Sequence, residues 1–375
     1  MADLKGRIAE LQEACANPRK RLDHYLSQGK KVVGVFPVYT PEELIHASGM
    51  IPMGCWGAQT EIKLAKRFLP AFACSIMQTT LELGLRGSYD GLSAVVIPTL
   101  CDTFRCISQD WRFGVKNIPM IPITYPQNRV IEAAEDFLIS EYEALLARLS
   151  IITGEMMTDD SLENSIKVYN AHTAAMNRFS AVANDHLDVI TPTIRHQIMK
   201  SAQFYEKGEH TAIVNEIIEG LEELPKYVFK GKKVILSGIV AEPNELLEIL
   251  EENNIAVVGD DLAQETRQYR TAIPEKGGTP IRRLAKQWMN RKGCCLAHED
   301  FKQRGEMLAE MCKETGASGV MYCLMKFCDP EEYDYPICRS ALQDVGIPTL
   351  MLEIDQQSTS CEQARTRVQT FADMI

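Results

Sequence analysis

Apolar residues form short continuous runs toward both ends of the chain and recur at helical spacing in its middle. Four of these runs have the length and residue types of buried parallel strands: Lys31–Phe36, Ala94–Cys101, Lys233–Val240 and Gly319–Phe327. The first and third runs lead through Pro41 and Pro243 into the helical patterns EELIHAS and NELLEILEENN. Strands that alternate with helices predict an α/β fold with parallel sheets.

The two ends of the chain repeat one another. In each half, a strand and a proline-initiated helix precede a strand that ends at a cysteine, Cys101 or Cys328. A short strand that opens with Ile-Pro follows, at Ile118 and at Ile347. This weak internal repeat is typical of a doubly wound α/β unit. We therefore expect two Rossmann-like doubly wound lobes with parallel sheets, whose strand ends face a shared cleft.

Between the two repeats the pattern becomes helical. In TDDSLENSIKVYN, for example, Leu162, Ile166 and Tyr169 share one helix face, and the preceding polar residues are candidates for an N-cap. We expect about four helices in this insert. The predicted organisation is a helical lead-in at 1–29, a first α/β lobe at 30–128, a helical region at 129–228 and a second α/β lobe at 229–375.

The charge and the chain's first residues exclude several classes of function. The formal net charge of -11 argues against a nucleic-acid partner, because DNA and RNA favour basic surfaces. The opening MADLKGRIAELQEA is polar and lacks the apolar core of a secretory signal. No window approaches the roughly 18 uninterrupted apolar residues that a membrane helix needs. We expect a cytoplasmic protein without a membrane partner.

Twelve cysteines are unusual for such a protein. In a reducing compartment a disulfide framework is not expected, and metal binding becomes the better explanation for some of them. No CxxC pair and no ferredoxin-type run occurs in the sequence. Any cluster must therefore be assembled from cysteines that are far apart in the chain.

Three cysteines are the best candidates to converge. Cys101 and Cys328 end equivalent strands, and Cys74 lies at or just before the start of a helix that Pro70 can initiate. A helix N-terminus favours a thiolate or an anionic cluster. Each cysteine by itself could also be an inert buried residue. Three protein ligands would leave one position open for a small ligand, as catalytic metal sites do.

The spacing disfavours the remaining nearby cysteines. Cys323 lies five residues before Cys328 on the same strand, about 16 Å away at ~3.3 Å per residue. Cys106 follows Cys101 by five residues, which on a helix turns it away. Cys294 and Cys295 are adjacent and cannot both point at one iron.

Two acidic residues are candidates for proton transfer. Glu42 and Glu43 follow Pro41, where carboxylates commonly interact with the helix dipole. If either residue faces the cleft instead, it could assist proton movement. No nucleotide-binding glycine motif or nucleophile elbow occurs.

Several longer motifs resemble one family. The segments AFACSIMQ, IPTLCDT, MKFCDPEEYDYP, EIDQQ, EQARTR, FPVYTPEELIHASGMIPMG and DDLAQETRQ are similar to those of the 2-hydroxyacyl-CoA dehydratases, and most similar to the smaller, β subunit. The resemblance covers essentially the whole chain. It implies that Cys74, Cys101 and Cys328 hold a 4Fe-4S cluster with one open iron site.

The resemblance also implies an activity and partners. The family eliminates water from (R)-2-hydroxyacyl-CoA to give an enoyl-CoA through a ketyl radical, after an ATP-dependent iron–sulfur activator protein injects one electron. The substrate is expected mainly on a homologous α subunit, while the β subunit relays or stores the electron. The implied setting is amino-acid fermentation in an anaerobe. Two alternatives stay open: a related activator-dependent iron–sulfur reductase, and a two-lobed small-molecule binding protein without redox chemistry.

Overall fold

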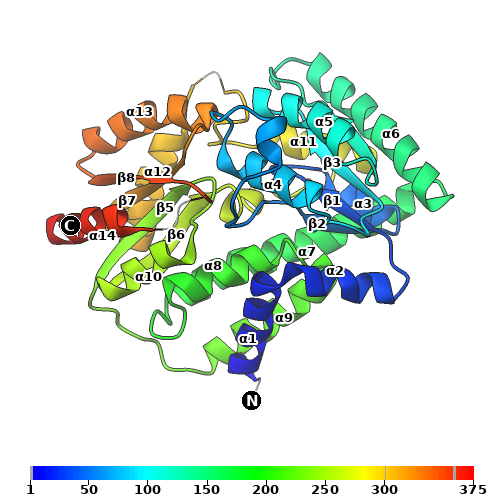
Figure 1. Ribbon diagram of the computed structural model, residues 1–375. Coiled ribbons are helices and arrows are strands. Elements are labelled where there is room, and N and C mark those ends of the chain that lie inside the picture. The colour runs from blue at the N-terminus through cyan, green and yellow to red at the C-terminus, as the bar shows by residue number, and fades with distance from the viewer. Residues whose placement is uncertain (1–2, 300, 358–359) are drawn as a thin grey trace.

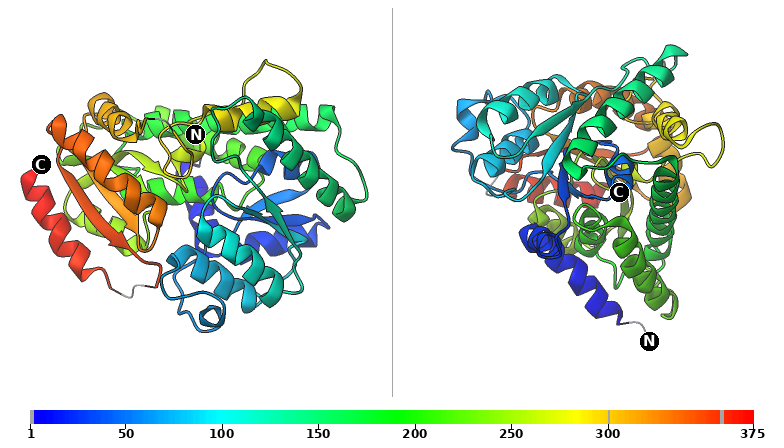
Figure 2. Two further views of the ribbon diagram at one scale, coloured as in Figure 1. Left: turned by 90° about the horizontal axis from the view of Figure 1, so that it is seen from above. Right: turned by 90° about the vertical axis from the view of Figure 1, so that its right-hand side faces the viewer.

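The computed structural model describes residues 3–299, 301–357 and 360–375. Its core is a pair of four-stranded parallel sheets, which lie side by side in Figure 1 and are seen from above in Figure 2. The strands of the first sheet are β1 (Val32–Val35), β2 (Ile51–Gly54), β3 (Ala94–Pro98) and β4 (Met120–Ile123). Those of the second are β5 (Lys232–Gly238), β6 (Ile255–Leu262), β7 (Gly319–Met325) and β8 (Thr349–Ile354).

The two sheets have the same topology. Their strand orders are β2-β1-β3-β4 and β6-β5-β7-β8, and every pairing is parallel. The first strand of each lobe therefore lies inside its sheet, and the chain reverses its winding direction there. Both faces of such strands are covered, which explains why β1 is buried along its whole length and reads VVGV. The predicted α/β class, with two Rossmann-like lobes, is confirmed.

Helices flank both sheets. Around the first sheet they are α2 (Pro18–Ser27), α3 (Glu42–Ala47), α4 (Ser75–Leu85) and α5 (Asp102–Gly114), with a 3-10 turn, η1, at Ala65–Arg67. Around the second they are α10 (Asn244–Glu252), α12 (Arg304–Thr315), α13 (Asp329–Asp344) and α14 (Glu362–Met374), with a second turn, η2, at Thr266–Gln268. Pro41 and Pro243 stand at the N-caps of α3 and α10, as the proline pattern predicts.

The middle of the chain is helical, as expected. It forms α6 (Ala133–Thr153), α7 (Asp159–Ala183), α8 (Pro192–Ser201) and α9 (Lys207–Glu222). Thr158 and Ser161 close a capping box at the start of α7. Helices α7, α8 and α9 pack with the N-terminal α1 (Leu4–Ala16) around a second apolar core, on one side of both sheets in Figure 1.

One helix of the second half crosses to the first. Helix α11 (Pro280–Asn290) packs on α6 and α7, and its Trp288 ring lies 4.6 Å from that of Tyr125 and 5.6 Å from that of Tyr39. The sheets consequently share one continuous apolar core. The domain boundaries given above stay a prediction.

Several strands end before the apolar runs do: β3 stops at Pro98 rather than Cys101, and β5 at Gly238 rather than Val240. Strand β6 runs through Asp260 and Asp261 to Leu262, because buried Arg195 and Arg267 pair with these two carboxylates and allow them inside the sheet. Strand β7 stops at Met325, two residues before the expected end, and Phe327 takes a left-handed backbone with φ 62° that turns the chain toward α13.

None of the helices within the described ranges is long and apolar enough to cross a membrane.

Candidate functional site

Each of the three candidate cysteines is the N-cap residue of a helix. Cys74 precedes α4, Cys101 precedes α5 and Cys328 precedes α13. First-turn backbone N–H groups point at the sulfurs: Met77 at Cys74, Thr103 and Phe104 at Cys101, and Glu331 at Cys328. The Met77 N–H also donates to the Cys74 carbonyl oxygen, at 3.1 Å. First-turn N–H groups and the helix dipoles together favour negative charge at the sulfurs.

The three cysteines line the same hollow. The hollow has a volume of about 380 Å³ and also receives Arg105, Lys302 and Tyr333 from the surrounding helices and loops. A smaller apolar recess continues from it and is lined by the same three cysteines together with Trp56, Met77, Phe104, Leu296 and Met325. The structure thus brings together residues that are up to 254 positions apart, as the sequence argument expects.

The topology explains this convergence. Pro37 and Val38 follow β1, and Ile239 follows β5, and all three line the apolar recess. The hollow therefore lies outside the carboxyl ends of both sheets, where each winding direction reverses. Open α/β sheets bind their ligands at this switch point.

The donor set fits a multi-iron cluster better than a single metal ion. Across the described ranges, no three His, Cys, Asp or Glu side chains are arranged to hold one metal ion. In a 4Fe-4S cluster each thiolate binds a different iron, so the sulfurs need not meet at one point. Soft thiolate ligands at first-turn N–H groups, above an apolar recess, match what such a cluster requires.

The thiols are not ionised by their surroundings alone. Burial raises the pKa of Cys74 to about 12 and also raises the pKa of Cys101 and of Cys328. The charge of Cys101 adds to the rise at Cys74, and the charges of Cys74 and Cys101 add to that at Cys328. Thiolates that raise one another's pKa in this way need a positive centre nearby, which a bound metal provides.

Cys295 also lines the hollow, and the sequence argument set it aside. Its sulfur donates a hydrogen bond of 3.0 Å to Glu331 Oε1, whereas Cys294 is buried and faces the hydroxyl of Tyr39. The two adjacent thiols do not diverge: they are hydrogen-bonded to each other, and both lie near Arg267 Nη1, at 3.8 and 3.9 Å. Of the two, Cys295 is the one that lines the hollow. Cys106 is exposed, and Cys323 is buried within β7.

A buried charge network, Asp261, Arg267, Arg304 and Glu331, lies behind Cys295. Arg304 reaches Asp261 Oδ2 at 2.6 Å and Glu331 Oε2 at 2.9 Å, and Arg267 reaches Glu331 Oε1 at 3.0 Å and Asp261 Oδ2 at 3.1 Å. Burial alone would raise the pKa of Glu331, but Arg304 and Arg267 outweigh burial and hold this pKa below its usual value. The network fixes the first turn of α13, and with it Cys328.

The closing EIDQQ motif joins the two lobes beside Cys74. The backbone N–H of Gln356 donates to Ser75 Oγ at 3.1 Å, and its side-chain amide donates to Glu242 Oε2 at 2.9 Å. Thr79 Oγ1 of α4 donates to Gln356 Oε1 at 2.7 Å. The start of α4 is therefore held against the second lobe.

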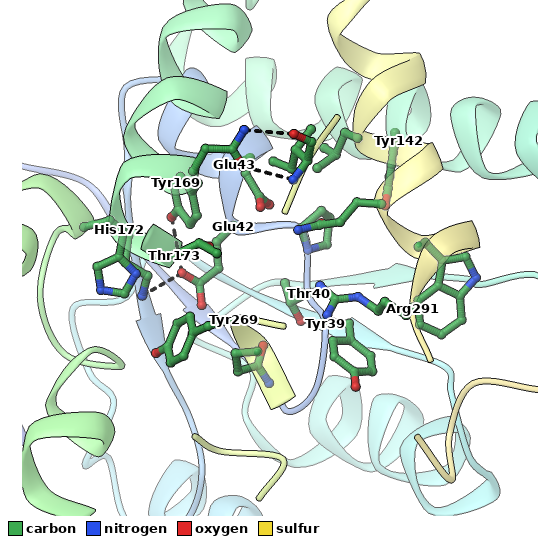
Figure 3. Close-up of a pocket in the computed structure, with 18 of the residues that line it drawn as sticks. Tyr39, Thr40, Glu42, Glu43, Tyr142, Tyr169, His172, Thr173, Tyr269 and Arg291 are labelled. Carbon is green, nitrogen blue, oxygen red and sulfur yellow. Dashed lines mark hydrogen bonds and ion pairs between the residues drawn. The ribbon is translucent and has the colours of Figure 1, made fainter. Parts of the chain in front are cut away.

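Glu42 and Glu43 lie in a different cavity, shown in Figure 3. Glu42 pairs with Lys207 Nζ at 2.9 Å and accepts a hydrogen bond of 3.2 Å from the Tyr169 hydroxyl. Burial raises the pKa of Glu43 to about 7. Of the two acids, Glu43 is the one that can hold and release a proton near neutral pH. Both face a cavity, but it is not the hollow that the cysteines line.

Comparisons with known proteins support the family that the sequence motifs resemble. The profile of the family "2-hydroxyglutaryl-CoA dehydratase, D-component" matches residues 37–375. The chain is 45% identical to the (R)-phenyllactyl-CoA dehydratase beta subunit of Clostridium sporogenes, over 98% of each chain. It is also 45% identical to the lactoyl-CoA dehydratase subunit beta of Anaerotignum propionicum, over 100% of each. Its identity to the (R)-2-hydroxyglutaryl-CoA dehydratase subunit beta of Acidaminococcus fermentans is 35%, over 99% of this chain and 100% of that one.

The fold and site define an α/β protein of two doubly wound lobes with a cysteine-lined hollow at their strand ends. Within that class, the chain belongs to the 2-hydroxyglutaryl-CoA dehydratase D-component family. The resemblance seen in the sequence motifs is thereby confirmed, and the chain is a subunit of the hydro-lyase type.

Proposed function

We propose that this chain is the β subunit of an oxygen-sensitive (R)-2-hydroxyacyl-CoA dehydratase. The observation that carries the proposal is the placing of Cys74, Cys101 and Cys328 at three helix N-caps around one hollow. The relatives named as dehydratase beta subunits span nearly the whole chain and support the same reading.

The three cysteines would hold a 4Fe-4S cluster with one iron open to a non-protein ligand. When bound, such a cluster accepts and donates single electrons. The residues around it have separate tasks. The first-turn N–H groups stabilise its negative charge, and the apolar recess of Trp56, Phe104 and Met325 excludes water.

The role proposed for this subunit is to relay or store one electron. Elimination from a 2-hydroxyacyl-CoA through a ketyl radical needs an electron from an ATP-dependent iron–sulfur activator and a homologous α subunit that carries most of the substrate contacts. Beside the three proposed ligands, the hollow holds a thiol paired with a carboxylate, because Cys295 is hydrogen-bonded to Glu331. Glu43 is the proposed proton-holding group of this chain, in its separate cavity. The cytoplasmic location stays a prediction.

Anaerobic reconstitution tests the proposal. The chain, coexpressed with a homologous α subunit, is supplied with activator, ATP, magnesium and a reductant, and is assayed against lactoyl-, phenyllactyl- and 2-hydroxyglutaryl-CoA. We expect dehydration of at least one thioester by the complex and none when Cys101→Ala replaces the wild-type chain. Turnover by the isolated chain with activator alone would contradict the assignment and favour a self-sufficient enzyme. A preparation without iron would favour a small-molecule binding protein, and thioester reduction would favour the reductase.

A further inference from the structure

A second cavity lies between the first lobe, α7 and the end of α11. Its walls come from the segment after β1 (Tyr39 to Glu43), from α7 (Tyr169 and His172), from Tyr269 and from Arg291. Figure 3 shows Glu42 and Arg291 entering it from opposite sides. Its volume is about 60 Å³, and none of the three candidate cluster cysteines is among the residues that line it.

Arg291 is the unusual member of this cavity. Six arginines in the described part of the chain are buried. Five of them pair with a carboxylate: Arg129 with Glu299, Arg195 with Asp260, Arg267 with Asp261, Arg283 with Glu163, and Arg304 with Glu331. Arg291 is only 8% exposed, yet within those same ranges its guanidinium has no hydrogen bond and no ion pair. Its one close partner is the ring of Tyr39, at 4.0 Å.

An unpaired guanidinium in a buried cavity is costly, because a buried charge needs a counter-charge and hydrogen-bond acceptors. The two carboxyl groups of the cavity do not meet this need. Glu42 is already neutralised by Lys207. Glu43 makes no ion pair with Arg291 in the described structure, and burial favours its neutral form at and below about pH 7, its pKa. When Glu43 is protonated, the charges of Lys207 and Glu42 cancel. The net charge of the cavity is then the single positive charge of Arg291.

The size of the cavity limits what can supply the missing charge. One buried water occupies roughly 10–15 Å³ of a cavity. The cavity of about 60 Å³ therefore has room for about four to six water-sized groups, which is a ligand of about four to six non-hydrogen atoms. Guanidinium is planar and binds a carboxylate through two parallel hydrogen bonds. A single net charge favours a monoanion over a phosphate dianion. Aromatic rings of Tyr39, Tyr142 and Trp288 around the cavity suit a short carbon chain.

We propose that this cavity binds a small monocarboxylate of two or three carbons, with its carboxylate on Arg291 and a hydrogen bond from the Glu43 carboxyl. A CoA thioester is far too large for the space. The site is therefore separate from the cysteine-lined hollow and does not depend on the function proposed above.

Thermal unfolding of the full chain, purified anaerobically, tests this proposal. Acetate and propionate are titrated against chloride at constant ionic strength, and saturation-transfer NMR follows the ligand methyl signal. We expect a saturable rise of the unfolding temperature and a saturation-transfer signal with both carboxylates. Acetamide, which has the shape of acetate without its charge, and hexanoate, which is too long, should give neither. No response of the wild-type chain to acetate beyond that to chloride would overturn the proposal.

Variants locate the response. Arg291→Met keeps an apolar, unbranched side chain but removes the guanidinium that contacts Tyr39, and should weaken acetate binding by at least about tenfold. Arg282→Met is the matched control, because Arg282 lies on the same helix, pairs with Glu135 and Asp136 at the surface and does not line the cavity. Its acetate response should equal that of the wild type. If Arg291→Met does not fold, Arg291→Lys keeps the charge but loses the two-point contact, and should also bind about tenfold more weakly. An unchanged affinity in a folded Arg291 variant would overturn the proposal.

Discussion

A cysteine at a helix N-cap has different surroundings from a cysteine inside a sheet. The sulfurs of Cys74, Cys101 and Cys328 face first-turn backbone N–H groups of helices, whereas Cys323 lies within β7, where the backbone groups are engaged in the ladder. Residues that lie next to or near these cysteines in the sequence indicate this difference. An aspartate follows both Cys101 and Cys328, and Pro70 precedes Cys74 closely. Cys295 could not be found in this way, because it lies in a loop with no periodic pattern.

Removing any of the three N-cap cysteines should abolish the cluster. Cys74→Ala, Cys101→Ala and Cys328→Ala each leave two thiolates, which cannot hold a cubane against hydrolysis. Iron content and the visible absorbance of anaerobically purified protein measure the loss. Cys106→Ala and Cys323→Ala should keep full iron, since one side chain is exposed and the other is buried in β7. Full iron in any of the first three variants would remove that residue from the ligand set.

Glu43 should make stability depend on pH. Its pKa rises from 4.5 to about 7 on folding because of burial, so the folded chain holds a proton that the unfolded chain releases. The contribution of Glu43 to the free energy of unfolding is fully present below about pH 4.5. It is lost as the pH rises toward about 7. Other ionisable groups face Glu43 and shape this value: Glu42, Arg291, Lys207, Tyr125, Tyr142 and Tyr169.

Glu43→Gln mimics the protonated form at every pH and should remove this dependence. Between pH 5.5 and 7 the free energy of unfolding of the wild type should fall by about 2 kcal/mol relative to the variant. Urea unfolding at both pH values measures the difference. Parallel pH profiles would show that Glu43 is ionised in the folded protein.

At the scale of elements, the start of α13 is held by groups that are distant in the sequence. Asp261 on β6, Arg267 on η2, Arg304 on α12 and Glu331 on α13 form one buried network. The sequence shows the polar residues of the DDLAQETRQ motif, but not their partners. Three of the network's four ion pairs join residues 27 to 64 positions apart; such pairing depends on how the lobe folds, and no local pattern records it.

Arg304→Ala should therefore destabilise the second lobe strongly. It leaves Asp261, Glu331 and Asp334 without one of their counter-charges, which costs about 3–5 kcal/mol for a buried pair. Iron content should fall too, because Cys328 caps the helix that the network fixes. Arg282→Ala is the matched comparison: Arg282 also binds two acids, Glu135 and Asp136, but at the surface, where a pair is worth less than about 1 kcal/mol. Equal losses of stability in chemical unfolding would contradict the role given to the network.

At the scale of the whole molecule, the repeat predicted from the sequence is present in full. Both sheets place their first strand inside and their third strand beside it, so Cys101 and Cys328 leave equivalent strands toward one hollow. The helical region and the lead-in were also visible as periodic patterns. The crossing of α11 was not, because its amphipathic pattern says which face is buried but not which helices cover it. The cavity around Arg291 follows from that crossing and was missed with it.

The last prediction is that oxygen destroys the proposed cluster, because small molecules can reach the hollow. The hollow is bordered by Phe327 and Tyr333, which are 39% and 81% exposed, so small molecules can reach the space between the two lobes. A cluster held by three cysteines there keeps one iron without a protein ligand. We expect air to bleach the visible absorbance of the purified chain within minutes to hours. Cys295 is the side chain placed to close the open position, since it lines the hollow. Cys106 is exposed and is not among the residues that line it. Because Cys295 is hydrogen-bonded to Glu331, Cys295→Ser should bleach at the wild-type rate. A wild-type spectrum that is stable in air for days, together with rapid bleaching of Cys295→Ser, would instead make Cys295 the fourth ligand.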